Sequence, residues 1–176
     1  MRNNKTLTYI STTDRAAALR AELKKLGISS RQVSIRTDYY SGGSAIHVMI
    51  KDPSISLAKV ESLATVHESI HRDMFGEILS GCNRYVSVDY STAASDAIRN
   101  AYLPAVKTAI DTLGTSESSL IPVADTPFSV GRNNGSVTVW RTDDDPRTSG
   151  FVANTYDANG AARLIGVKMR DAQTAA

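Results

Sequence analysis

The sequence predicts an α+β protein built on a small, mostly antiparallel sheet, and three observations lead to this expectation. A helical apolar pattern opens the chain. Two runs of alternating apolar and polar residues follow around a glycine-rich turn. The second half carries one long helical pattern and then several short strand-like runs. We expect the first half to follow the order helix, strand, strand, helix, strand, with the helices packed on one face of the sheet.

The opening elements have the clearest patterns. Residues 12–26 are expected to form a helix, because apolar side chains recur there at three- and four-residue spacing and Gly27 suits the end of a helix. Two strands are expected at residues 33–38 and 46–51, where apolar and polar side chains alternate. Residues 39–44, Tyr-Tyr-Ser-Gly-Gly-Ser, predict the hairpin loop between them.

A second helix is expected at about residues 56–75, followed by a loop at 76–83 and a third strand at 84–90. The helix is predicted from apolar residues three and four positions apart, which would form its buried face: Val60, Leu63, Val66, Ile70 and Met74. Residues 1–90 would together make one αββαβ domain.

The second half, residues 91–176, predicts a helix and a β-rich part that extends the same domain or forms a second small one. Residues 96–113 have a helical pattern in which Pro104 indicates either a kink or the junction of two helices. Asn134-Gly135 is a strong hairpin signal. Strands are expected at residues 120–123, 128–130, 137–140 and 151–153.

The end of the chain allows two interpretations. Residues 161–169 fit either a short helix or a strand. Residues 171–176 are expected to form a frayed tail.

Composition limits the classes of protein. The chain has 176 residues, 41% of them hydrophobic and 22% charged, which is typical of a globular protein. Its net charge of +2 does not indicate a nucleic-acid binder by itself. Cys82 is the only cysteine, and no apolar run suits a signal peptide or a membrane span. We therefore expect a cytoplasmic protein that does not bind membranes.

One string suggests catalysis. His67-Glu68-Ser69-Ile70-His71 matches the H-E-x-x-H pattern, in which two histidines four apart on a helix bind zinc and the glutamate serves as general base. A zinc-dependent hydrolase using His67, His71 and Glu68 is thus one hypothesis. However, Arg72 follows directly, and the one other histidine, His47, precedes the motif on a strand. We favour a solvated helix edge, with no metal or other cofactor.

Other residues suggest binding. Arg31, Arg36, Tyr39 and Tyr40 combine cations with aromatic rings, which are the ingredients of single-strand nucleic-acid stacking. Surface residues of a hairpin are the simpler interpretation, and a nucleic-acid-binding module remains an alternative. The run Asp143-Asp144-Asp145 lacks the spacing of a calcium loop and predicts an acidic, solvent-facing turn.

The first half also has a recognisable combination of segments. A leading helix carries Leu19, Arg20, Leu23 and Lys24. The strand Val33-Ser34-Ile35-Arg36, the hairpin Tyr40-Ser41-Gly42-Gly43-Ser44 and the closing strand Tyr85-Val86-Ser87-Val88 follow it. This block resembles the large polyvalent-protein-associated domain family, type twenty-nine, whose members occur on phages and conjugative plasmids.

The resemblance implies a non-catalytic accessory protein of a phage or other mobile element. Such a protein would act against host defences such as restriction or CRISPR systems, by binding a host protein or a protein–nucleic-acid complex. The family supplies no catalytic residues to carry over. We expect the partner-binding surface to include Arg31, Arg36, Tyr39 and Tyr40.

Overall fold

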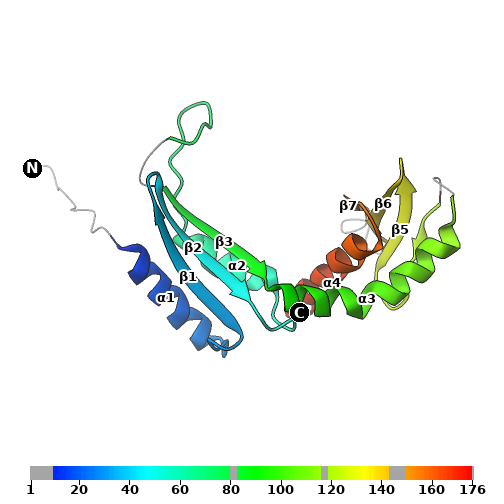
Figure 1. Ribbon diagram of the computed structural model, residues 1–176, viewed down its shortest axis with the longest axis horizontal. Coiled ribbons are helices and arrows are strands. Elements are labelled where there is room, and N and C mark those ends of the chain that lie inside the picture. The colour runs from blue at the N-terminus through cyan, green and yellow to red at the C-terminus, as the bar shows by residue number, and fades with distance from the viewer. Residues whose placement is uncertain (1–9, 80–82, 116–118, 143–149, 176) are drawn as a thin grey trace, which may run out of the picture. The chain divides into compact units, whose positions relative to one another are not determined.

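The computed structural model describes residues 10–79, 83–115, 119–142 and 150–175, and it has an α+β fold (Figure 1). The chain divides into two compact units. Unit 1 comprises Met1–Asp52 and Leu57–Asp89, and unit 2 comprises Pro53–Ser56 and Tyr90–Ala176. Within the described ranges, no helix combines the length and the apolar character needed to cross a membrane.

Unit 1 contains the expected order of helix, strand, strand, helix, strand. Its elements are α1 (Thr12–Lys25), β1 (Val33–Tyr40), β2 (Gly43–Ile50), α2 (Leu57–Ala64), the short 3-10 helix η1 (Thr65–His67) and β3 (Asn83–Tyr90). The predictions for the first helix, the hairpin strands and the third strand are confirmed. The hairpin turn is tighter than expected, because Tyr40 pairs with Gly43 and only Ser41 and Gly42 lie between them.

The three strands lie in the order β1-β2-β3. β1 and β2 are antiparallel. Gly43 lies against Asn83, and His47 Nδ1 lies 2.9 Å from Ser87 Oγ, so β2 and β3 keep a constant offset and run in the same direction (Figure 1). A parallel pair needs a crossover connection, which α2 provides. α1 packs against β1 and β2 and also contacts α2.

Alternation along β2 separates a buried face from an open face. Ile46, Val48 and Ile50 are buried, whereas His47 and Met49 are exposed. The buried residues belong to an aliphatic core to which α1 and α2 also contribute: Ala16, Leu19, Leu23, Val33, Val60 and Ala64.

A buried arginine joins three elements of this unit. Arg15 of α1 is only 5% exposed, and its Nη2 lies 3.1 Å from both Thr12 Oγ1 and Ser44 Oγ. Its Nη1 donates a hydrogen bond to the backbone carbonyl of His67. Hydrogen bonds from a charged donor are strong, so these bonds from Nη1 and Nη2 tie α1, β2 and η1 together.

The prediction of one helix over residues 56–75 is wrong. α2 ends at Ala64, η1 ends at His67, and Glu68 is extended. A continuing α-helix would pair the carbonyl of His67 with the amide of His71. Instead the carbonyl accepts from Arg15, and the amide of His71 donates to Asn83 Oδ1 over 2.8 Å. Residues from elsewhere in unit 1 therefore bond to both the carbonyl and the amide that a continuing helix would pair.

Unit 2 contains a four-stranded antiparallel sheet and two long helices. The elements are α3 (Thr92–Leu113), β4 (Ile121–Pro122), β5 (Phe128–Asn133), β6 (Ser136–Arg141), β7 (Gly150–Thr155) and α4 (Ala158–Ala175), with strand order β4-β5-β6-β7. The core combines residues from both helices and from the sheet: Val106, Ala109, Val123, Phe128, Val130, Val137, Val139, Ala161, Ala162 and Ile165.

Several expectations for this half are resolved. The hairpin at Asn134-Gly135 is confirmed, with φ of 47° and 78° as a two-residue turn with left-handed residues requires. α3 runs through Pro104 as one helix. Residues 161–169 lie in α4. The expected frayed tail is wrong up to Ala175, since α4 includes Asp171, which accepts a 2.7 Å hydrogen bond from Ser56.

Close packing of α3 on α4 depends on one glycine. A Cβ at Gly166 of α4 would clash with Ile98 Cγ2 and would lie 3.0 Å from Tyr102 Cδ2. Both neighbours belong to α3, and Ile98 is buried. Because packed interiors yield little, even one added methyl group has to push the helices apart.

We predict that Gly166→Ala lowers the free energy of unfolding by about 1–3 kcal/mol, despite the better helix propensity of alanine. Urea unfolding followed by circular dichroism measures the change. Ala101→Ser, which enlarges an exposed α3 residue, is the control and should stay within about 0.5 kcal/mol of the wild type. An unchanged or raised stability of Gly166→Ala would contradict the packing described here.

Candidate functional site

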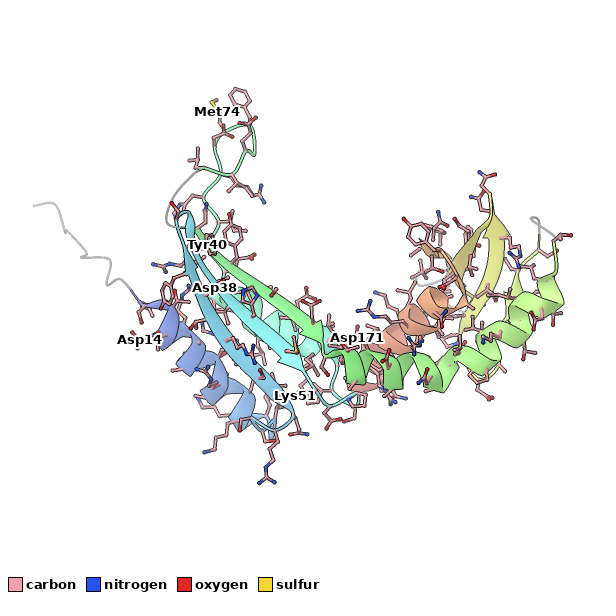
Figure 2. The ribbon with its side chains drawn as sticks, in the orientation of Figure 1. Asp14, Asp38, Tyr40, Lys51, Met74 and Asp171 are labelled. Carbon is pink, nitrogen blue, oxygen red and sulfur yellow. The ribbon has the colours of Figure 1, made fainter. Side chains whose placement is uncertain are left out.

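A hairpin-like projection, which we call the finger, rises from one end of unit 1. It comprises residues 69–79, between η1 and β3, and Met74 lies at its far end (Figure 2). The bridge between Arg72 and Ile78 joins its two sides, and the bridge between Ser69 and Arg84 joins its base to β3. The finger is thus an ordered structure where the sequence predicts the end of a helix, up to residue 75, and the start of a loop.

The tip of the finger is a tight turn. The amide of Gly76 donates to the carbonyl of Asp73 over 3.1 Å, and the amide of Asp73 donates to the carbonyl of Glu77 over 2.9 Å. Gly76 has φ of 85°, the left-handed conformation that closes a three-residue hairpin loop. The Asp73 carboxylate accepts from the amides of Phe75 and Glu77, each at 2.9 Å. Arg72 Nη1 donates to the Gly76 carbonyl over 2.9 Å.

The base of the finger is held by a buried asparagine. Asn83, 3% exposed, accepts from the His71 amide over 2.8 Å and donates to the Leu79 carbonyl over 2.6 Å. The amide of Leu79 in turn donates to the His71 carbonyl over 2.9 Å. One side chain therefore links both sides of the finger to the start of β3.

Large apolar side chains are exposed along the finger. Met74 is 90% exposed and Phe75 is 83% exposed, and both lie in the hydrogen-bonded turn. Ile78 and Leu79 are about half exposed. Exposed apolar patches are uncommon on proteins and mark surfaces that bind other molecules. The finger is the candidate functional site for this reason.

The structure separates the histidines of the H-E-x-x-H string. His67 lies in η1, and its Nε2 is 3.6 Å from Glu22 Oε2 of α1. His71 is exposed in the finger, beyond an extended Glu68. Four residues of helix would bring the two side chains to one face, whereas an extended segment spans up to about 13 Å. Among the described residues, no group of three or more histidine, cysteine, aspartate or glutamate residues could hold a metal ion.

The predicted partner-binding residues do not form one cluster. Tyr39 and Tyr40 are neighbours on β1 and point to opposite faces. Tyr39 lies on the α1 side, with its hydroxyl 3.1 Å from Thr13 Oγ1. Arg36 shares the open face with Tyr40, and Arg31 precedes β1 and is exposed. These four residues are therefore not brought together as a stacking platform.

The two tyrosines also have different chemistry. The hydrogen bond with Thr13 lowers the pKa of Tyr39, and partial desolvation raises the pKa of Tyr40. Tyr40 pairs with Tyr85 of β3, their ring centroids 6.2 Å apart, across the open face. Sheet packing, rather than a ligand, explains this pair.

The finger was missed from the sequence, although one signal was present. Asp73-Met74-Phe75-Gly76 has aspartate at the first position and glycine at the fourth position of a β-turn. The apolar three- and four-residue spacing of the surrounding residues conceals this turn signal. Two other candidates, Asp143-Asp144-Asp145 and Cys82, lie outside the described residues.

We predict that Asn83→Ala loosens the finger without unfolding unit 2. Loss of its two hydrogen bonds should speed hydrogen exchange at the amides of His71 and Leu79 at least about tenfold, since each bond contributes about 1 kcal/mol and leaves a buried partner unsatisfied. Exchange in α3 and α4 should be unchanged. Exchange mass spectrometry with peptide resolution measures both regions, and equal protection of the finger in the variant would contradict the assigned role of Asn83.

We predict that His67 and His71 do not bind zinc together, because they lie in different local structures. Metal analysis of tag-free protein should find no stoichiometric zinc, and His67→Ala should leave the metal content unchanged. Zinc at one equivalent in the wild type and its loss in the variant would restore the hydrolase hypothesis.

The candidate site is identified by the exposed side chains and the hydrogen bonds of the finger alone. No protein-family model, curated protein or solved structure matches the chain. The finger offers exposed apolar side chains on a hydrogen-bonded frame. Such an arrangement can bind a partner surface.

Proposed function

We propose that this protein is a non-catalytic binding protein that recognises a partner protein through its finger. The observation that carries the proposal is the exposure of Met74 and Phe75 on a turn that hydrogen bonds hold in shape. A disordered loop would have to lose conformational entropy on binding, and a finger already held in its fold loses less.

The chemistry of the tip favours a protein partner over a nucleic acid. Phe75 and Met74 are large apolar residues of the kinds enriched at protein interfaces. Asp73 and Glu77 flank them, and the nearby cation, Arg72, is bonded to the carbonyl of Gly76. Carboxylates at the tip would repel phosphates, so a partner with an apolar pocket fits better.

The resemblance of the first half of the chain to the polyvalent-protein-associated family suggests the setting of this binding. In that setting the protein would serve a phage or another mobile element in the host cytoplasm. Its partner would be a host defence protein or a protein–nucleic-acid complex, which it would inhibit by occupying a surface. The finger supplies a compact element for such an inhibitor, because a few anchoring side chains carry most of the affinity of an interface.

The test is affinity capture from lysate of the host cells, comparing the wild-type chain with Phe75→Ser. We expect the wild type to capture a defined protein and Phe75→Ser to retain it at least about tenfold less, because an apolar anchor is removed. The fold should persist, since Phe75 is 83% exposed. Circular dichroism and thermal unfolding verify this.

Tyr156→Ser is the matched control, because Tyr156 is 97% exposed and lies in unit 2. It removes an exposed aromatic ring without touching the finger, and we expect it to capture as the wild type does. Capture of the same proteins in equal amounts by Phe75→Ser and the wild type would refute the proposed role of the finger.

A further inference from the structure

A groove between α1 and the outer side of β1 has an apolar floor. Leu23 of α1, Ile28 of the loop that follows, and Val33 and Ile35 of β1 line it. The groove has a volume of about 560 Å³, which is typical of sites that accept a few side chains or a small ligand. Ile28 and Ile35 are partly exposed, so the floor is accessible.

The rim of the groove is cationic. Arg20 and Lys24 of α1 line it, and Arg36, whose side chain lies on the open face of the edge strand β1, borders it; all three residues are exposed. Among the described residues that line the groove there is no carboxylate. The groove therefore suits an occupant that combines apolar side chains with acidic ones.

Two features narrow the kind of occupant. The lining residues of the described chain include no aromatic ring on which a base could stack, which disfavours single-stranded nucleic acid. Arg20 Nη2 donates to the carbonyl of Ile35 over 2.8 Å, and Asp38 accepts from the amide of Tyr39, so side chains already engage outward groups of the edge strand. These contacts hinder the addition of an extended peptide to the edge of β1. The favoured occupant is therefore a compact turn with apolar side chains.

The finger has the matching chemistry. Its tip presents Met74 and Phe75, and Asp73 and Glu77 flank them. The apolar tip of the finger matches the apolar floor of the groove. The carboxylates beside the tip match the cationic rim in charge. Both features belong to unit 1 of the same chain.

The finger and the groove lie at opposite ends of unit 1, so one copy cannot place its finger in its own groove. The finger rises at the end that holds Tyr40 and the β1–β2 turn, and Lys51 marks the other end (Figure 2). The groove lies at the Lys51 end, since the amide of Lys51 donates to the backbone carbonyl of Gln32, the residue before the groove residue Val33. α1, with 14 residues, spans about 21 Å between the two ends.

We propose that the finger of one copy inserts into the groove of a second copy, so that the protein self-associates finger to groove. The inference rests on the proposed function in that the same finger is the binding element. Self-association covers Met74 and Phe75, and a partner protein therefore competes with it. A contact between two different surfaces is heterologous, and it also allows assemblies larger than a dimer.

The oligomeric state of the full chain tests the proposal. In sedimentation velocity at rising concentration, the wild type should associate, and Phe75→Ser should weaken association at least about tenfold. Lys24→Glu/Arg36→Glu should weaken it similarly by reversing the rim. Lys25→Glu/Lys51→Glu is the matched control, because both residues are exposed cations of unit 1 that do not line the groove. It should associate like the wild type.

Mixing the variants identifies the contact. Phe75→Ser keeps an intact groove and Lys24→Glu/Arg36→Glu keeps an intact finger, so the mixture should form a one-to-one complex that neither variant forms alone. An interface elsewhere on the chain would not be restored in this way. Glu77→Lys should associate more strongly with Lys24→Glu/Arg36→Glu than with the wild type, because the swapped charges attract.

A wild type that stays monomeric up to about 1 mM would overturn the proposal. So would association that Phe75→Ser or Lys24→Glu/Arg36→Glu leaves unchanged, or a mixture of the two that stays monomeric. These outcomes leave the proposed function intact, because capture of a partner is measured separately. Failed capture together with finger-to-groove association would instead refute the proposed function alone.

Discussion

The hydrogen bond from the Arg15 guanidinium to the carbonyl of His67 is the interaction on which the shape of unit 1 depends. A buried cation needs every available acceptor, and hydrogen bonds that involve a charged group are stronger than neutral ones. The bond that the His67 carbonyl accepts from Arg15 is therefore stronger than the helical bond that it would accept from a further turn. α2 ends at Ala64 and η1 at His67, and with this carbonyl bonded to Arg15 the chain continues from Glu68 as an extended segment.

Asn83 completes this change of direction. Its side chain accepts from the amide of His71, which a continuing helix would pair with the carbonyl of His67. It also donates to the carbonyl of Leu79. The residues that follow then fold back as the finger. A stretch that would have buried Met74 in a helix face instead exposes it at a tip, so two buried polar side chains create the apolar surface on which the proposed binding rests.

The finger and the groove give unit 1 two ends of different chemistry. One end presents apolar side chains with carboxylates, and the other presents an apolar floor with a cationic rim. If the protein associates finger to groove, free copies and partner-bound copies are linked by mass action, since both states use Phe75. Self-association would then keep the apolar tip from unspecific contacts until a partner of higher affinity is present.

The sequence by itself determined the elements whose signals are local. The apolar spacing of α1, the alternation of β2 and the left-handed pair Asn134-Gly135 each act over a few residues, and the structure confirms them. Residues 161–169 were ambiguous, because their pattern suits a helix and a strand, and packing of Gly166 against α3 accompanies the helix.

Only the tertiary structure decided the conformation of residues 65–75 and the position of the candidate site. Their apolar spacing is helical, and the string around His67 and His71 fits a zinc motif only on a helix. Arg15 lies 52 positions from His67, and Asn83 lies 12 positions from His71. No local pattern can reveal such partners, since they meet only when the sheet has formed. Buried polar groups had to be satisfied, and that requirement outweighed the helical preference of the segment.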